Sequence, residues 1–252
     1  MENKVSSLFR PFILALSFLT IFPISFGFKE YREEDFKATI LFFPIIALLV
    51  GLLNILVYIL ATPLFSNDIV VLFILFVQYI CFNLFHFDGF LDFFEAVFSQ
   101  KHKREEILKI MKDPRIGSFG LFFGLFYMLF KFFLLKNTLS LYLPLFVLYP
   151  IVGRASQILI MGFLRPAKKE GLGYMFRDIP IFYTLSAYMI GVFLVYFLGS
   201  FKFLLFYLIS SMLSFLFIGG MAFKKLGGFT GDVVGASNEI AELLFLFVFQ
   251  IF

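Results

Sequence analysis

Long apolar segments separated by short polar ones run along almost the whole chain. A hydrocarbon core about 30 Å thick is crossed by roughly 20 apolar residues in a helix. Inside it, every backbone polar group must be satisfied by a helix or a closed barrel. Seven segments are long enough for membrane-spanning helices: 38–62, 69–90, 119–135, 139–162, 180–199, 202–222 and 233–251. The pattern therefore predicts an all-α, polytopic integral membrane protein.

The N-terminal segment 11–27 is also apolar, but it contains Pro11 and Pro23. Because proline lacks the backbone donor and interrupts a helix, we expect a short, broken or re-entrant helix here in addition to the seven spans. No small-residue cleavage site follows, so we expect the segment to be retained. Without a tandem repeat or a low-complexity linker, the sequence predicts one membrane domain over residues 1–252.

Composition and charge support a membrane protein and suggest its orientation. The mean hydropathy is +0.97, far above that of soluble domains. Lys and Arg gather in the segments 29–37, 99–118, 163–178 and 222–232, which fall on one side if the spans alternate. Since positive loops favour the cytoplasm, we expect these four segments to form a cytoplasmic face. The expected surroundings are a lipid bilayer, with no nucleic-acid partner; a homo-oligomer is left open.

Three carboxylates interrupt the otherwise apolar stretch FHFDGFLDFFEAVFS, residues 85–99. At 100° per residue, Asp88, Asp92 and Glu95 fall within an arc of about 60° on a helix. Crowded carboxylates repel one another unless a proton or a cation is shared among them. Hard oxygen ligands suit Mg²⁺, Mn²⁺ or Ca²⁺, so the stretch predicts a divalent metal site. The alternative is the water-facing end of an amphipathic helix.

A second acidic stripe lies in GGFTGDVVGASNEIAEL, residues 227–243. Asp232, Glu239 and Glu242 fall within about 80° of one another on a helix, again beside an apolar span. Arg154, inside a predicted span, is expected to pair with one of the two acidic stripes, and contact with the substrate is the alternative.

Two basic loops that contain glycines are expected on the same face. KIMKDPRIGSFG, residues 109–120, presents Lys112 and Arg115 beside a helix-breaking proline, and RPAKKEGLGYMF, residues 165–176, contains Lys168, Lys169, Gly171 and Gly173. Glycines let backbone N–H groups approach a phosphate closely, and the cations neutralise it. Topological charge alone is the alternative for these loops. Carboxylates that hold a metal beside cations that hold phosphates predict transfer at a pyrophosphate.

Four motifs, in their order along the chain, resemble the signatures of the cobalamin synthase family, the adenosylcobinamide-GDP ribazoletransferases. They are FHFDGFLDFFEAVFS, EEILKIMKDPRIGSFG, EGLGYMF and GGFTGDVVGASNEIAELLFL, and the N-terminal LSFLTIFPI is also similar. The resemblance covers the length of the chain. It departs from the commoner pattern D-G-x-x-D-x-x-D-G at Glu95-Ala96, where Glu moves the carboxylate outward by one methylene.

The resemblance implies a reaction and a set of site residues. The 3′-hydroxyl of α-ribazole, or of its 5′-phosphate, attacks the cobinamide phosphate of adenosylcobinamide-GDP, and GMP leaves. It also implies Mg²⁺ at Asp88, Asp92 and Glu95, and a prokaryotic cytoplasmic membrane. The candidate catalytic residues are Asp88, Asp92, Asp232 and Glu239; the candidate substrate-binding residues are Lys112, Arg115, Lys168, Lys169, Gly171 and Gly173. One of the carboxylates of Asp232, Glu239 and Glu242 is expected to act as the general base or to hold a second metal.

Two other classes of protein remain as alternatives. An ion or metabolite transporter would also place carboxylates in its spans, but near mid-membrane. A CDP-alcohol phosphotransferase performs similar chemistry, but its signature begins D-G-x-x-A-R, and DGFLDFFE lacks the Ala-Arg pair.

Overall fold

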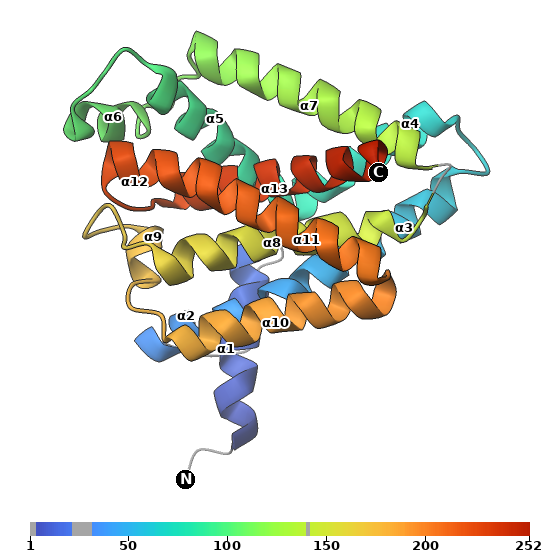
Figure 1. Cartoon of the computed structure of the whole chain (residues 1–252), viewed down its shortest axis with the longest axis horizontal. Coiled ribbons are helices and arrows are strands. Elements are labelled where there is room, and N and C mark those ends of the chain that lie inside the picture. Colours follow the sequence, from blue (N-terminus) through green and yellow to red (C-terminus); the bar gives the residue numbers. More distant parts are fainter. Residues whose placement is uncertain (1–3, 22–31, 140–141) are drawn as a thin grey trace.

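The structure, a computed structural model, describes residues 4–21, 32–139 and 142–252 (Figure 1). Within these ranges every regular element is a helix. The helices are α1 Lys4–Leu19, α2 Glu33–Thr39, η1 Ile40–Phe42, α3 Phe43–Ala61, α4 Asn67–Gln78, η2 Tyr79–Asn83, α5 Leu84–Phe98, α6 Arg104–Ile110, α7 Ser118–Leu139, α8 Leu145–Phe163, α9 Leu172–Met175, α10 Ile181–Leu198, α11 Phe201–Ser214, η3 Phe215–Gly219, α12 Gly220–Leu226 and α13 Gly231–Ile251.

Six helical stretches are long and apolar enough to cross a membrane, and a bent pair makes a seventh. The six are Glu33–Ala61, Ser118–Thr138, Leu145–Phe163, Ile181–Leu198, Phe201–Leu226 and Gly231–Ile251. The prediction of an all-α, polytopic membrane protein with about seven spans is confirmed.

The bent pair differs from the expected straight span over 69–90. The structure has two helices here, Asn67–Phe82 and Leu84–Phe98, at an angle of 89°. Between α4 and α5 lies η2, a π-helical turn, and such turns insert an extra residue and allow a sharp change of direction. The straight span is therefore wrong, because apolar length alone does not report a bend. The carboxylates of residues 85–99 lie on α5, after the bend.

The N-terminal helix α1 contains Pro11 and has an apolar part, Phe9–Leu19, that is too short to span a bilayer. At 1.5 Å per residue this part is about 16 Å long, against a hydrocarbon core of about 30 Å. Residues 22–27 of the expected N-terminal segment lie outside the described residues.

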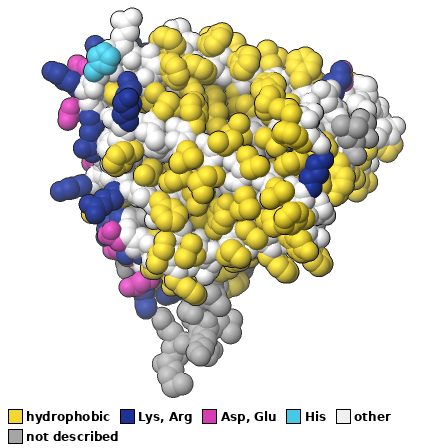
Figure 2. Space-filling view, in the orientation of Figure 1, with side chains coloured by type: hydrophobic (Ala, Val, Ile, Leu, Met, Phe, Trp, Pro, Cys, Tyr) yellow, Lys and Arg dark blue, Asp and Glu magenta, His cyan; other side chains and the backbone are white. Residues whose placement is uncertain are grey.

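Helix α8 forms the centre of the bundle (Figure 1). Its side chains from Leu145 to Met161 are all buried, and α3, α10, α11 and α13 pack around it. Helix α13 in turn packs against α5 as well as α8. Large apolar side chains cover the visible outer surface between the helix ends (Figure 2), as expected for a protein surrounded by lipid.

The described parts of the four basic segments, which for the first segment are residues 32–37, lie together at one end of the bundle. Figure 2 shows most of the visible charged side chains along that edge, where Figure 1 places α2, α6, α9 and α12. Contacts between segments hold this end together: Arg104 with the carbonyl of Ala167, Lys112 with Glu170, the Phe229 amide with the carbonyl of Arg165, and Arg177 with Glu33. The expectation that these segments share one face therefore agrees with the structure.

Candidate functional site

Three aspartates from two helices meet at this charged end. Asp88 and Asp92 are one turn apart on α5, and Asp232 lies in the first turn of α13. The helices come close at Gly89, where a Cβ atom would lie only 2.8 Å from the Cα atom of Asp232. At Gly235 of α13, a Cβ atom would lie 2.8 Å from the backbone oxygen of His86. Any side chain at either glycine would separate the helices that bring the three aspartates together.

The charges of these aspartates act on one another. Asp88 and Asp232 are both close enough to Asp92 for an electrostatic interaction. The nearest compensation for Asp232 comes from Lys168 and from the hydroxyl of Thr230, which donates a hydrogen bond of 3.0 Å to its carboxylate. Over the part of the chain that the structure describes, the cluster therefore contains more negative charge than its neighbours neutralise.

The donor atoms of this cluster suit a hard divalent cation, because all three are carboxylates. Their present side-chain positions do not enclose one: across the described ranges, no three His, Cys, Asp or Glu side chains converge tightly enough to hold a metal ion. The fit to Mg²⁺ is one of donor chemistry and of position on two facing helices.

Glu95, the third residue expected at the metal, points elsewhere. Its carboxylate accepts a hydrogen bond of 2.7 Å from the backbone N–H of Gly120, in the first turn of α7, and lies against Gly117. An acidic side chain at a helix N-terminus is favourable because the first backbone N–H groups lack partners. The structure thus groups Asp88 and Asp92 with Asp232, and places Glu95 at the start of α7.

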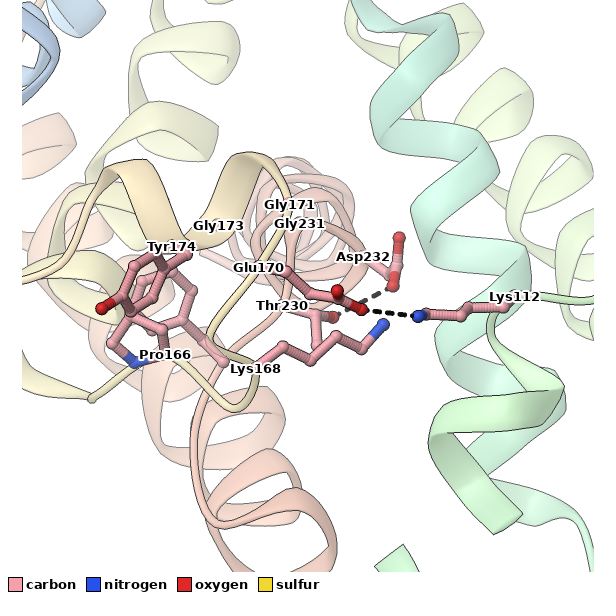
Figure 3. A pocket seen from close by; sticks show the side chains of 11 residues that line it. Lys112, Pro166, Lys168, Glu170, Gly171, Gly173, Tyr174, Thr230, Gly231 and Asp232 are labelled. Carbon is pink, nitrogen blue, oxygen red and sulfur yellow. Dashed lines mark hydrogen bonds and ion pairs between the residues drawn. The ribbon is translucent and has the colours of Figure 1, made fainter. Parts of the chain in front are cut away.

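A polar cavity of about 380 Å³ opens beside Asp232. One wall is formed by Lys168 and Gly171 of the loop before α9 and by Gly173 in the first turn of α9, and Lys112 reaches in from the segment after α6 (Figure 3). The remaining lining residues are Pro166, Glu170, Tyr174, Phe229, Thr230, Gly231 and Asp232. Gly171 has φ of +82°, a conformation that side chains rarely adopt. The structure therefore brings four of the expected substrate-binding residues, Lys112, Lys168, Gly171 and Gly173, to one cavity.

The ion pair of Lys112 and Glu170 crosses this cavity. Their side chains are 2.9 Å apart and largely exposed to solvent. The hydrogen bond from Lys112 lowers the pKa of the Glu170 carboxyl below its usual value. Lys112 is thus held in place by a carboxylate that an anionic ligand could replace.

Arg115 and Lys169, the other two expected substrate ligands, do not line the polar cavity. Arg115 is bound to Asp113 through two side-chain hydrogen bonds of 2.6 and 2.9 Å. These hydrogen bonds hold the pKa of the Asp113 carboxyl at about 2. Arg115 would have to leave Asp113 to reach a ligand.

An apolar cavity of about 350 Å³ adjoins the polar one. It lies among α1, α5, α8 and α13, and its apolar walls are formed by Phe18, Leu19, Phe43, Phe82, Phe85, Met161, Phe176, Phe229 and Val234. Asp88, His86 and Gln157 contribute polar groups. The two cavities share Asp232, Gly231, Gly173 and Phe229, so they meet at the aspartate cluster.

Glu239 and Glu242 lie apart from this cleft, in a fully buried network. The ammonium group of Lys131 is 2.6 Å from Glu242 and 3.4 Å from Glu239. Tyr79 and Tyr127 donate hydrogen bonds to Glu239. These contacts compensate both carboxylates from within the protein.

Helix α8 extends this network toward the cleft through Arg154. Its guanidinium hydrogen-bonds to Gln157 and Asn238 and lies 2.9 Å from a ring nitrogen of His86. Asn238 in turn donates a hydrogen bond of 2.9 Å to Glu242. Arg154 also interacts electrostatically with both glutamates, which agrees with its expected pairing to an acidic stripe.

Sequence reasoning missed several members of this network: Asn54, Gln78, Tyr79, Tyr127 and Lys131. The available signal was Lys131 itself, because a lysine inside an apolar span needs a nearby counter-charge. Thr230 and Gln157 in the cleft were missed as well, and single polar residues of these types give no comparable signal.

Fold and site together define a polytopic membrane protein with a cleft at one end, in which carboxylates, lysines and an apolar cavity converge. The family model described as cobalamin-5-phosphate synthase matches residues 11–250. The chain belongs to this family.

Relatives of similar length are named adenosylcobinamide-GDP ribazoletransferase. One from Alkaliphilus oremlandii is 35% identical over 94% of this chain and 95% of its own. One from Clostridium botulinum (strain Langeland) is 34% identical over 97% of this chain and 98% of its own, and one from Clostridium tetani is 29% identical over 94% and 95%. No solved structure matches the chain.

Proposed function

We propose that this protein joins adenosylcobinamide-GDP to α-ribazole, or to its 5′-phosphate. A new bond forms between the 3′-oxygen of the acceptor and the phosphorus attached to cobinamide. The bond from that phosphorus to the oxygen of GMP breaks, and GMP leaves with the electron pair. The observation that carries the proposal is a cleft lined by Asp88, Asp232 and two lysines, with Asp92 beside the two aspartates. It occurs in a family member whose relatives bear this activity in their name.

Lys112 and Lys168 are placed to bind the diphosphate. Both line the polar cavity, and two positive charges there offset the charge that develops on the departing GMP. Binding of the diphosphate by Lys112 would release Glu170, an exchange of one anion for another. Gly171 and Gly173 leave the cavity wall free of side chains, so phosphate oxygens can approach the backbone.

Mg²⁺ is the cofactor that fits this donor set, and we propose that Asp88, Asp92 and Asp232 hold it. When bound, it would supply positive charge at the diphosphate. Glu95 remains a predicted ligand of the family pattern, and it would have to release the Gly120 amide to act as one.

The proton of the attacking hydroxyl needs an acceptor at the junction of the two cavities. Asp232 lies there, and the hydrogen bond from Thr230 orients its carboxylate. A general base must come within hydrogen-bond reach of the proton that it removes. We propose Asp232 for this role, through the carboxylate oxygen that would not bind Mg²⁺. Glu239 was predicted as an alternative, and in the structure Lys131 and two tyrosines surround it.

We place the cleft on the cytoplasmic side of the membrane. Its end of the bundle contains the four basic segments, and positive residues favour the cytoplasm. In a Cys81→Ser background, cysteines at Ser118, Lys169 and Lys224 should react with an impermeant reagent only after permeabilisation, and one at Ser66 should react in intact cells. The reverse pattern would contradict this orientation.

The deciding experiment supplies the protein in liposomes with adenosylcobinamide-GDP, Mg²⁺ and either α-ribazole or its 5′-phosphate. We expect GMP and a cobalamin product in equal amounts, and no GMP when the acceptor is omitted. Absence of product, under conditions in which the Clostridium botulinum relative is active, would overturn the proposal. Release of CMP from CDP-alcohols or solute flux across the liposomes would instead indicate one of the two alternatives.

A further inference from the structure

The two cavities of the cleft differ in chemistry although they share a wall. The polar cavity contains Lys112 and Lys168, whereas six phenylalanines line the other cavity. A substrate pair with one multiply charged and one largely apolar, aromatic member would divide between them. The proposed reaction has such a pair of substrates, so the following inference rests on that proposed function.

The aromatic wall of the apolar cavity is already assembled. The ring of Phe176 contacts the ring of Phe18 at 5.7 Å and that of Phe43 at 6.3 Å between centroids. Phe43 and Phe176 are almost fully buried, with 1% and 4% of their surfaces exposed. Buried aromatic rings offer flat faces and edges against which another aromatic ring system can pack. The cavity is thus suited to a planar, uncharged ring system.

The size of the apolar cavity decides which of the two substrates it can hold. Its volume is about 350 Å³, near the lower end of the roughly 300–1000 Å³ that hold drug-sized ligands. A nucleoside with a bicyclic base fits this volume. A corrin macrocycle with its peripheral side chains and an adenosyl group is several times larger and does not fit.

The polar residues of the apolar cavity lie where a ribose would need them. Asp232 lies on the wall that the two cavities share, and Asp88, which lines the apolar cavity, is close enough to Asp232 for an electrostatic interaction. A base inserted among the phenylalanines would therefore direct its ribose toward the aspartate cluster. Its 3′-hydroxyl would then face the phosphates in the polar cavity.

We infer that the apolar cavity beside Asp88 is the acceptor site, which binds the aromatic base of α-ribazole, while the polar cavity binds the diphosphate of the corrinoid. The corrin itself stays outside both cavities. The cavity walls would then select the acceptor. Side chains of α1, α3, α5 and α8 limit the size of the base that can bind, independently of the corrinoid.

Ser17 offers a way to test this assignment without touching the aspartates or lysines. It lies on α1, is partly buried and lines only the apolar cavity. Ser17→Phe should fill part of the cavity. Ser66→Phe adds the same bulk at an exposed position before α4, away from the cleft, and serves as the matched control.

The first readout is steady-state kinetics with one substrate varied and the other saturating. Ser17→Phe should raise the KM for α-ribazole about tenfold or more, because overpacking a cavity is costly. The KM for adenosylcobinamide-GDP should change less than about twofold. The KM for the riboside of plain imidazole should rise less than the KM for α-ribazole does. Ser66→Phe should behave as wild type. An increased KM for the corrinoid alone, or no change for either substrate, would overturn the inference.

The second readout is binding without turnover, which separates this inference from the proposed reaction. The fluorescence of the benzimidazole base reports binding of α-ribazole directly, and the protein contains no tryptophan to interfere. We expect saturable binding to the wild type and to Ser66→Phe, weakened about tenfold in Ser17→Phe. If GMP release fails in every protein while this pattern holds, only the proposed reaction is wrong. If Ser17→Phe binds α-ribazole as the wild type does, the acceptor site lies elsewhere.

Discussion

Helix α13 contributes acids to two regions that differ in how their charge is compensated. Asp232 and Asp88 border the cleft with Lys168 nearby, and Asp92 is close enough to both aspartates for an electrostatic interaction. Two turns further along the helix, Glu239 and Glu242 are fully buried beside Lys131. One region retains excess negative charge at an opening; the other is paired inside the protein.

This difference separates binding from structural support. Buried charges persist only when they are paired and hydrogen-bonded, and the glutamates have both kinds of partner. Among the described residues, the aspartates have too few compensating partners, so a ligand can supply them. The amino-acid type is similar in the two regions, and what distinguishes them is whether the compensating charge is part of the protein.

The largest expected effect comes from removing the compensation in the buried network. Lys131→Met leaves Glu239 and Glu242 with Arg154 as the nearest cation, and breaking a buried ion pair costs about 3–5 kcal/mol. We expect the free energy of unfolding in mixed micelles, followed by circular dichroism, to fall by this amount. The double variant Lys131→Met with Glu242→Gln should recover much of the lost stability, because the positive charge of Arg154 and the negative charge of Glu239 then remain. A single variant as stable as the wild type would remove the distinction between the regions.

The aspartate cluster should respond in the opposite way. Asp92→Asn keeps the shape of the side chain and removes one of three repelling charges, so we expect unchanged or slightly increased stability. The rate of GMP release should fall by about a hundredfold to a thousandfold, the range found when a single charge-stabilising group is lost. Stability and kcat measured on the same preparation decide this. A loss of stability without a loss of rate would mean that the aspartate cluster, like the buried network, supports the fold.

A smaller effect is expected at the polar cavity. Lys168→Ala should lower kcat/KM for adenosylcobinamide-GDP about ten- to a hundredfold, the loss expected when one charge-assisted hydrogen bond is removed. The KM for α-ribazole should change little. Lys224, exposed on α12 at the same end, provides the matched control. Equal losses in Lys168→Ala and Lys224→Ala would mean that the lysines act only through the general positive charge of this end.

The smallest effect is expected at Arg115. Because this guanidinium already bonds to Asp113, binding a phosphate would exchange one anion for another. We expect Arg115→Lys to change kcat/KM for the corrinoid by less than about tenfold. A larger loss, confined to the corrinoid, would show that Arg115 leaves Asp113 to bind the substrate.

The sequence predicted the cluster on α5 more reliably than the grouping of acids on α13. Asp88 and Asp92 are four residues apart, so helical periodicity places them together. The same reasoning grouped Asp232 with Glu239, and Asp88 with Glu95, because seven residues return to almost the same angle. A helical wheel omits the axial distance, which is about 10.5 Å for seven residues. That distance takes Glu95 to the start of α7 and Glu239 into the buried network.

Contacts between helices explain the rest of what the sequence did not reveal. The span lengths follow from hydropathy, but the 89° bend between α4 and α5 depends on a π-helical turn that has no clear sequence signal. The pairing of Lys131 with Glu242 joins residues 111 positions apart in the chain. The apolar cavity is similarly formed by α1, α3, α5, α8 and α13 together, so the sequence of no single segment predicts it.

The most direct test of the distinction between the two regions is Mn²⁺ binding, measured by electron paramagnetic resonance on the purified protein without substrate. We predict saturable binding to the wild type that is weakened at least about tenfold in Asp92→Asn and in Asp232→Asn. Glu239→Gln should bind as the wild type does, because Glu239 already has Lys131 as its partner. Loss of Mn²⁺ binding in Glu239→Gln, with binding retained in the two aspartate variants, would contradict the account.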